Sequence, residues 1–519
     1  MTDKRRYFAA GALLLFILGA AGSIAAPAQQ PPRPPEFKEI MIARNIPDLA
    51  ARLKEFERIK AAYPESTMMA LIDDSIHGIK IELCSSLDDV LALQKTVAGQ
   101  GEGFEKIYSL YGAAMEIATH RNLPVFDKAG VVKAVLFYKD EAGKLLQDQA
   151  YVQSVPEDER PYLSEYAHEI QIGEAMSYLN AGEPEKAMNA LNAYKSAGGA
   201  PEGMFWYTFA EAAGKLGKNA DALLGYMDAA IENYEDAEAK AGDMWIKVNG
   251  KADGFDAALE AKRRELPYHP EEFAAPADWK GKAVLAEIFT GSECPPCAGA
   301  DIGFDGLIES VPGKFLAILE YHLPIPRPDP IINPATKTRQ QYYGVNSTPS
   351  TFFDGEAKAG GGGGRANAAE KYKEYLAEIK PRLSALPEAR LTAKAARTGD
   401  EITVDVAIEK PVEGAEIFVV LVQKEVRFQG GNGIVFHKMA VRDLRVVAPD
   451  APRAVFDLAA SEKATDEYLT EFEKTYDRIP NYKFAKRCFQ IDRNALQAVV
   501  FIQDKQTKKV HNAFSVDVK

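Results

Sequence analysis

The chain has 519 residues, a formal net charge of −13, 46% hydrophobic residues and 26% charged residues. This length allows roughly three or four domains, and the composition is that of a globular protein. The negative charge argues against nucleic acid and anionic membrane surfaces as partners, because their phosphate groups would be repelled.

The N-terminal residues have the three parts of a secretory signal. Lys4–Arg6 is basic, Tyr7–Ala21 is apolar, and small residues surround a cleavage point after Ala28. A signal peptide over residues 1–28 predicts export to the periplasm or the extracellular space, where disulfide chemistry is permitted. The alternative is an uncleaved membrane anchor, since the apolar stretch 7–26 comes close to the ~20 residues that span a bilayer.

Helical patterns dominate the next part of the chain. A proline-rich spacer, residues 29–36, leads into it. Residues 37–160 have mostly helical periodicity, with one apolar face that includes Leu49, Phe56 and Ile59. We expect a helical region there.

An internal repeat lies within the following segment, residues 161–265. Its recurring positions, 35 residues apart, are Ala175 and Ala210, Gly182 and Gly217, and Ala187 and Ala222, with Trp206 four residues before Ala210. The period and the small residues resemble the tetratricopeptide repeat, in which small side chains let two antiparallel helices approach closely. The resemblance implies stacked helix pairs that either bind a protein partner or form a structural stalk.

The most informative stretch follows a proline-containing linker, residues 266–278. An apolar run of strand length, Ala283–Phe289, leads through a Thr-Gly-Ser turn to Cys294-Pro-Pro-Cys297. A helix is expected to begin there, with Pro296 in its first positions. The helix dipole and free amides would favour a thiolate, and the second thiol lies close enough to close a disulfide.

Together with Ser347–Gly355 (STPSTFFDG), this stretch resembles the thioredoxin superfamily. The second motif is similar to that family's Thr–cis-Pro step followed by a buried strand and a turn. The resemblance implies that Cys294 is the exposed nucleophile and that Cys297 resolves the mixed disulfide. It also implies that the backbone of Thr348, beside a cis Pro349, pairs with an extended substrate peptide.

The chain departs from the family pattern around the first cysteine. Glu293 replaces the usual tryptophan, and neither Pro295 nor Pro296 has an N–H to donate. The amide and thiol of Cys297 would then be the main donors to a Cys294 thiolate. Both departures favour a more reducing couple, and hence a reductase or isomerase over a disulfide oxidase.

Thioredoxins also keep a buried acid on the preceding strand, which takes the proton of the resolving cysteine. Glu287 is the candidate in this chain. It lies seven residues before Cys294, one more than the family pattern, so it either serves this role or points to the wrong side of the strand.

Three further residues leave alternatives open. His322 opens a proline-rich loop that either shapes a substrate groove, joins the two thiolates in binding copper, or is only structural. The copper alternative is disfavoured because copper-delivery relatives use Cys-x-x-x-Cys. Cys84 and Cys488 are interpreted as buried thiols, although sequence alone leaves a disulfide between them open. We predict no metal and no cofactor.

Strand periodicity replaces helical periodicity in the C-terminal part. The thioredoxin-like α/β domain is expected over residues 279–387, with Gly360–Gly364 as a mobile loop before its last helix. From Arg390 apolar residues alternate with polar ones, and a short helix is expected at Thr465–Tyr476. Residues 388–519 therefore predict an all-β sandwich of the immunoglobulin-like type.

These features predict a multidomain protein with a helical repeat, a thioredoxin-like domain and a β-sandwich. The predicted function is that of an exported enzyme, a thiol–disulfide oxidoreductase acting on protein disulfides with an unknown redox partner. The alternative is a binding or scaffold protein of the cell envelope whose cysteine pair is a structural disulfide.

Overall fold

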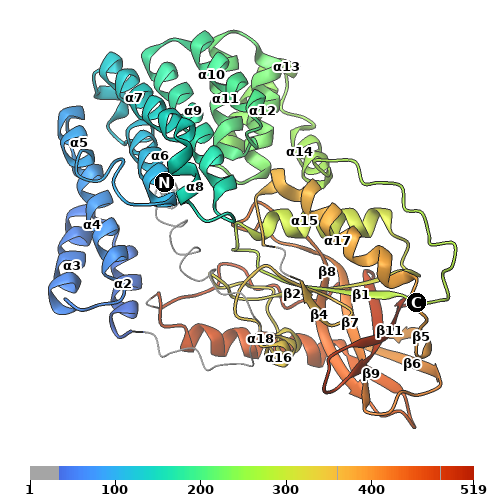
Figure 1. Ribbon diagram of the computed structural model, residues 1–519. Helices are drawn as coiled ribbons and strands as arrows, with labels where there is room; N and C mark the ends of the chain where they lie inside the picture. The colour runs from blue at the N-terminus through green and yellow to red at the C-terminus, as the bar shows by residue number, and fades with distance from the viewer. Residues whose placement is uncertain (1–33, 359–360, 480) are drawn as a thin grey trace. The chain divides into compact units, whose positions relative to one another are not determined.

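The computed structural model describes residues 34–358, 361–479 and 481–519. The predicted signal peptide lies outside these ranges. The chain forms two compact units, one made of residues up to Ala230 with Tyr234–Phe255 and Asp477–Pro480, the other of Ile231–Asn233, Asp256–Tyr476 and Asn481–Lys519 (Figure 1). The fold is therefore multidomain, with a helical unit and a unit that contains a mixed sheet and a three-stranded antiparallel sheet.

The first unit is helical throughout its described secondary structure. Helices α6, α7 and α9 enclose a core that includes Ile107, Val131 and Ile170, all fully buried. An amphipathic helix buries its apolar stripe only against another element, so neighbouring helices pack together. The helices are α2 (Glu36–Arg44), α3 (Leu49–Ala62), α4 (Met69–Leu83), α5 (Leu87–Gln94), α6 (Phe104–Ala118), η2 (Leu123–Val125), α7 (Lys128–Gln147), α8 (Gln149–Ser154), α9 (Arg160–Ala181), α10 (Pro184–Ser196), α11 (Gly203–Lys215), α12 (Asn219–Ile231) and α13 (Ala237–Asn249).

The 35-residue period of the sequence recurs in the backbone of α9 to α12. Gly182 and Gly217, which follow the first helix of each pair, both have a left-handed conformation, with φ of 81° and 72°. The N–H of Glu183 donates to the carbonyl of Tyr178, and the equivalent pair 35 residues later makes the same bond, each at 2.9 Å. Glycine ends a helix in this conformation without a Cβ penalty. The ends of α9 and α11 therefore have the same backbone conformation and the same hydrogen bond, 35 residues apart.

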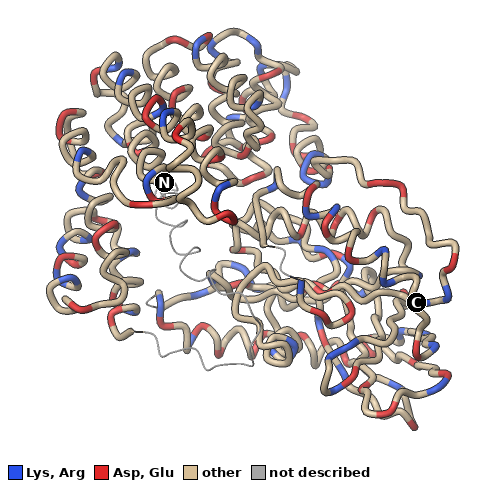
Figure 2. The backbone as a smooth tube through the Cα atoms, in the orientation of Figure 1, with Lys and Arg blue, Asp and Glu red and all other residues tan. Residues whose placement is uncertain are grey.

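Charged residues of both signs are interspersed along the helices of both units (Figure 2). This distribution agrees with a composition in which acidic residues exceed basic ones by only a modest margin, 75 against 62. Surface ion pairs of this kind contribute little to stability individually. The folding of each unit therefore depends mainly on its apolar cores.

An eight-stranded sheet forms the centre of the second unit, in the order β11-β10-β7-β8-β2-β1-β3-β4. Strands β1 and β2 are parallel, and every residue of both is buried. Helices α15 and α17 lie together on one side of these strands and α16 on the other (Figure 1). Strands covered on both faces have continuous apolar sequences, which is why the run before the cysteines predicted one. The elements are α14 (Phe255–Arg264), β1 (Val284–Thr290), α15 (Cys297–Ser310), β2 (Leu316–His322), α16 (Pro334–Tyr343), β3 (Ser350–Phe353), β4 (Glu356–Lys358), η3 (Arg365–Asn367), α17 (Ala368–Leu383), β5 (Arg390–Thr398), β6 (Glu401–Glu409), β7 (Ala415–Arg427), β8 (Phe436–Val447), β9 (Arg453–Asp457), α18 (Leu458–Thr475), β10 (Leu496–Asp504) and β11 (Val510–Asp517).

The C-terminal strands differ from the expected separate sandwich. Strands β5, β6 and β9 form a second sheet whose apolar residues, such as Val404 and Phe456, share a core with Val419 of β7 and Val500 of β10. Two layers are therefore present. However, the larger layer is continuous with the sheet that carries the cysteines, because β8 pairs with β2. Lateral strand pairing of this kind joins residues more than 100 positions apart, and a local pattern cannot predict it.

The predicted linker also packs against the second unit. The hydroxyl of Tyr268 donates to the Ile302 carbonyl of α15 at 3.0 Å, and the rings of Phe273 and Trp279 contact Phe315. A side chain at Gly306 would lie 2.1 Å from the Tyr268 hydroxyl. The proline-containing segment thus covers α15 instead of only spanning two domains.

The glycine run is packed against the start of α15. The N–H of Gly363 donates to the Pro296 carbonyl at 2.7 Å, and the N–H of Gly299 donates to the Gly363 carbonyl at 2.8 Å. Because the first N–H groups of a helix have no partner within the helix, the second bond satisfies one of them. The prediction of a mobile loop is therefore wrong for residues 361–364, which cap the helix that carries Cys297.

We expect Gly362→Ala to destabilise this cap. The added Cβ would lie 1.9 Å from the Pro296 carbonyl oxygen, so the loop has to move away from α15. Overpacking of this kind costs about 1–3 kcal/mol. Urea unfolding measures the loss, with Gly313→Ala as the matched control because a Cβ there meets nothing within 4 Å. Equal stabilities of the two variants would contradict the assignment of a cap.

Candidate functional site

Cys294 and Cys297 form a disulfide at the start of α15. Strand β1 ends at Thr290, a turn carries Cys294, and Pro296 caps the helix that begins at Cys297. The predicted strand, turn and helix are therefore present around the motif. However, only 1% of Cys294 is exposed, which differs from the exposed nucleophile that the family resemblance implies.

The backbone donors around the disulfide are already engaged. The N–H of Cys297 donates to the Cys294 carbonyl at 3.0 Å, and the N–H of Ala298 donates to the Pro295 carbonyl at 3.2 Å. The N–H of Cys297 was expected to be a main donor to the Cys294 sulfur. It donates instead to the backbone carbonyl of Cys294.

Thr348 and Pro349 lie beside the disulfide, and the peptide bond between them is cis. The Thr348 Oγ1 lies 3.4 Å from the Cys294 Sγ and 3.0 Å from the carbonyl oxygen of Ile325. The Thr348 carbonyl oxygen lies 3.7 Å from the same sulfur. A hydroxyl has one proton, so at any moment it donates either to the sulfur or to the Ile325 carbonyl.

The proline-rich loop after β2 bonds to the turn that carries Cys294. Asp329, which is fully buried, accepts the N–H of Ser292 at 2.6 Å and the N–H of Ile331 at 2.7 Å. It also contacts the Nδ1 of His322 at 3.1 Å. Burial opposes ionisation of Asp329, but the attraction of His322 and these hydrogen bonds hold the pKa of its carboxyl below the usual value. His322 therefore orients Asp329, which in turn anchors the turn.

A second loop, from the connection between β7 and β8, contacts the same turn. The N–H of Asn432 donates to the Ser292 carbonyl at 3.1 Å, and its side-chain amide donates to the Gly291 carbonyl at 3.3 Å. The N–H of Gly431 donates to the Glu293 carboxylate at 3.1 Å. Two loops that are more than 100 residues apart in the chain thus position the turn before Cys294.

Glu287 lies on the face of β1 opposite to α15. Its carboxylate accepts two bonds from the Arg339 guanidinium, at 2.8 and 2.9 Å. Side chains alternate between the faces of a strand, and Thr290, on the other face, donates to Asp301 of α15 at 2.8 Å. Glu287 therefore points away from Cys297. The predicted catalytic role does not fit this position, and Glu287 instead neutralises the buried Arg339.

Three carboxyl groups lie on the α15 face of the sheet. They are Asp301 and Asp305 of α15 and Glu320 of β2. Burial, with repulsion among the three, raises the pKa of Asp301 and of Glu320 well above the usual range. Burial also raises the pKa of Asp305, to about 6, against the attraction of Lys438.

Sequence reasoning missed these acids, although a signal was available. Asp301 and Asp305 follow Cys297 at intervals of four residues. Residues spaced by four lie on one face of a helix, so both aspartates share the face of Cys297. Two acidic residues on one face of a helix that is otherwise almost entirely apolar predict buried carboxyl groups on that face.

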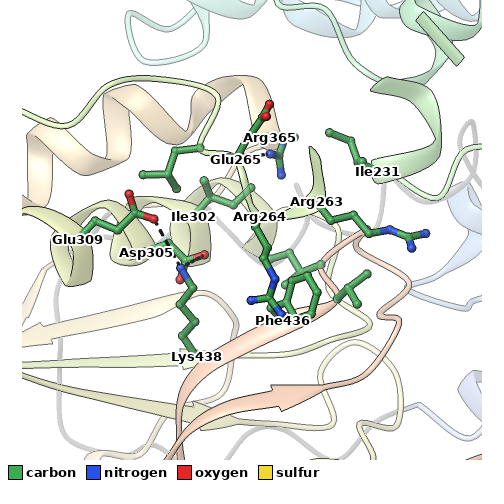
Figure 3. A pocket seen from close by; sticks show the side chains of 14 residues that line it. Ile231, Arg263, Arg264, Glu265, Ile302, Asp305, Glu309, Arg365, Phe436 and Lys438 are labelled. Atoms are coloured by element: carbon green, nitrogen blue, oxygen red, sulfur yellow. Dashed lines mark hydrogen bonds and ion pairs between the residues drawn. The ribbon is translucent and has the colours of Figure 1, made fainter. Parts of the chain in front are cut away.

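A pocket of about 230 Å³ lies next to these acids, within the second unit (Figure 3). Figure 3 shows the Lys438 ammonium directed toward Asp305 and Glu309, with N–O distances of 3.5 and 3.8 Å. On the other side of the pocket the Arg264 guanidinium lies over the Phe436 ring, 3.6 Å from its centroid. The lining is therefore mixed in charge.

Among residues 34–358, 361–479 and 481–519, no group of three or more His, Cys, Asp and Glu side chains is arranged to bind a metal ion. In the same ranges, no helix combines the length and the apolar character needed to cross a bilayer.

Comparison with known proteins identifies no family for this chain. No known protein family matches it, and no curated protein matches it. Among solved structures, it is similar to HBP35 of Porphyromonas gingivalis, with 13% sequence identity and a TM-score of 0.31 over 46% of this chain and 76% of that one. A likeness at this score carries no argument about fold or activity.

Proposed function

We propose that the protein is an exported thiol–disulfide oxidoreductase that acts on protein disulfides through Cys294 and Cys297. The main support is the position of their disulfide at the N-terminus of α15, with the Cys294 sulfur against the cis Thr348–Pro349 step. A helix N-terminus stabilises a thiolate, and a nearby second thiol can resolve a mixed disulfide.

Each residue of this site has a role in the proposed reaction. The Cys294 thiolate attacks a substrate disulfide and releases one substrate thiolate. The sulfur of Cys297 then attacks that of Cys294, which closes the internal disulfide and releases the second substrate thiolate. A dithiol reductant restores the starting state. The backbone of Thr348, next to Pro349, pairs with the substrate peptide, and its hydroxyl donates to the Cys294 thiolate, a stronger acceptor than a disulfide sulfur.

The resolving thiol needs a proton acceptor when it attacks. Glu287 is on the wrong face, so we assign this role to Asp301, which shares a helix face with Cys297 and is held by Thr290. When ionised, a buried carboxylate is a stronger base than an exposed one, so it accepts the proton of the thiol. When protonated, the same group supplies a proton to the Cys297 thiolate as the disulfide is reduced again.

A reductase or isomerase direction remains the favoured one. Pro295 and Pro296 have no N–H to donate to the Cys294 sulfur, and the amide of Cys297 bonds to a carbonyl. A less stabilised thiolate makes the couple more reducing. The carboxylate of Glu293 contributes less than expected, because Gly431 and Arg327, 3.9 Å away, offset its charge.

The remaining assignments belong to the same proposal. We assign residues 279–387 to a thioredoxin-like domain, supported by the order of a strand, the cysteine helix, a second strand, a helix and the cis-proline step. We assign 161–265 to tetratricopeptide-like repeats that recruit a protein partner, supported by their recurring helix ends. Export to the periplasm or beyond is supported by the N-terminal signal pattern alone.

One observation favours the alternative of a binding protein with a structural disulfide. Cys294 is 1% exposed and Cys297 is fully buried, so a substrate sulfur cannot reach either without movement of the surrounding loops. A scaffold protein of the envelope needs no such movement. The two functions predict different reduction potentials.

A redox titration of the full-length protein separates them. We expect a potential of about −120 to −270 mV for a working couple, near the reducing end of this range for a reductase. A structural disulfide would lie below about −300 mV. The measurement equilibrates the protein with glutathione or dithiothreitol and counts alkylated thiols. A value below −300 mV would favour the scaffold and refute the enzyme.

A further inference from the structure

A continuous group of charged side chains lies beneath α15. Asp301 is one helical turn beyond Cys297, and Asp305 is one turn further. Glu320 lies on the strand below, and Lys438 of the neighbouring strand β8 binds Asp305 at 3.5 Å. We call Asp301, Glu320, Asp305 and Lys438 the carboxyl track. It runs from the helical turn of the resolving cysteine to the pocket of Figure 3.

The inner half of the carboxyl track consists of two buried acids, Asp301 and Glu320, whose pKa values are raised above the usual range. Asp301 and Glu320 are 6% and 2% exposed, and repulsion from Asp305 adds to the effect of burial on the pKa of each. One oxygen of each makes no hydrogen bond within the described residues. The Thr290 hydroxyl at Asp301 and the attraction of Lys438 at Glu320 oppose this shift, but burial prevails, so both carboxyl groups favour the protonated form. These two groups therefore store protons next to the redox centre.

The outer half of the carboxyl track reaches the pocket. Asp305 and Lys438 both line it, and the pKa of Asp305, about 6, lies close to neutrality. A group of this kind exchanges protons with water at physiological pH, since both of its protonation states are accessible. The facing charged groups are Asp301 and Glu309 on its own helix, Glu320 on β2, Lys438 on β8 and Arg365 on η3.

We propose that the carboxyl track carries protons between the pocket and Cys297. Protons then enter and leave the redox centre through the pocket. This inference rests on the proposed redox function, and it goes beyond it by assigning Glu320, Asp305, Lys438 and the pocket to the reaction. Asp305 and Lys438 are positioning and relay groups, because neither touches the sulfur atoms.

The proton balance of the reaction follows the carboxyl track. A thiolate of the dithiol attacks the Cys294 Sγ and forms a mixed disulfide, the Cys294–Cys297 S–S bond breaks, and the electron pair leaves with the Cys297 Sγ. The second thiolate of the reductant then displaces Cys294 as a thiolate, and the reductant leaves as its cyclic disulfide. Asp301 gives its proton to the Cys297 sulfur and is reprotonated by Glu320. Asp305 reprotonates Glu320 and then takes a proton from water in the pocket. In the opposite direction Asp305 releases a proton to water in the pocket, Glu320 passes its proton to Asp305 and Asp301 passes its proton to Glu320. The Asp301 carboxylate then accepts the proton of Cys297.

Reduction of the full-length protein by dithiothreitol tests the carboxyl track. Quenched-flow alkylation gives the rate of disulfide reduction as a function of pH, in H₂O and in D₂O. We expect Asp305→Asn to lower the rate at pH 7 by at least about 10-fold, to remove the inflection near pH 6 and to increase the solvent isotope effect. Asp305→Glu should restore all three. The matched control is Glu309→Gln, which removes a carboxylate that also faces Lys438 but is half exposed, and it should behave as wild type.

A second variant covers the case in which Asp305→Asn fails to fold. Glu320→Gln keeps the shape of the side chain and removes the proton donor, so it should show the same loss of rate. Wild-type profiles and isotope effects in both variants would overturn the carboxyl track while leaving the redox function intact. A disulfide that dithiothreitol does not reduce would instead refute the redox function, and the carboxyl track with it.

Discussion

Replacing Cys294 with serine is expected to abolish the reduction of insulin disulfides that the wild-type protein catalyses with a thiol donor. A serine hydroxyl is not ionised at neutral pH and cannot form a mixed disulfide, so the first step of the reaction is lost. Removing a catalytic nucleophile typically costs ~10³-fold or more. The rate should therefore fall to that of the thiol donor alone, as measured by the turbidity of precipitating insulin chains.

Two variants make this result specific. Cys84→Ser removes a free thiol of the first unit and should leave the activity unchanged. Cys297→Ser keeps the nucleophile and removes the resolving thiol, so it should accumulate a covalent complex with the substrate, visible on non-reducing gels. If the wild-type protein is no more active than Cys294→Ser, the enzyme proposal is wrong.

Arg339→Met is expected to lower the free energy of unfolding by about 3–5 kcal/mol. The guanidinium is buried, binds the Glu287 carboxylate through two bonds and lies near the rings of Tyr343 and Phe501. Removing it leaves a buried carboxylate without its cation, which is more costly than removing both members of the pair. Urea unfolding monitored by circular dichroism measures the change.

The double variant Arg339→Met with Glu287→Met is the control. It removes both charges and fills their volume with apolar side chains, so it should recover most of the lost stability. It also separates a structural from a catalytic role of Glu287. We expect the folded double variant to keep its thiol–disulfide activity. Loss of that activity in a variant of full stability would indicate that Glu287 has a catalytic role.

The local features around the Cys294–Cys297 disulfide were predictable from the sequence. The apolar run before the cysteines, the Pro-Pro dipeptide between them and the Thr348–Pro349 step each depend on neighbours within a few residues. Such short-range preferences act on backbone dihedral angles and on hydrogen bonds within one element. The same holds for the 35-residue repeat, whose glycines at Gly182 and Gly217 end equivalent helices.

The surroundings of that site depend on contacts between distant segments. Pairing of β8 with β2 makes the C-terminal strands part of the cysteine-bearing sheet, and it brings Lys438 to Asp305. The glycine run caps α15 from about 65 residues away in the chain. None of these contacts leaves a periodic trace in the sequence.

By itself the sequence determined the multidomain organisation and the cysteine pair placed between a buried strand and a helix start. Only the tertiary structure decided that Glu287 faces Arg339, that Cys294 is buried, and that Asp301 and Glu320 lie under α15. The physical reason is that a dihedral preference is local, whereas burial and the pKa values that follow from it depend on every segment that packs around a group.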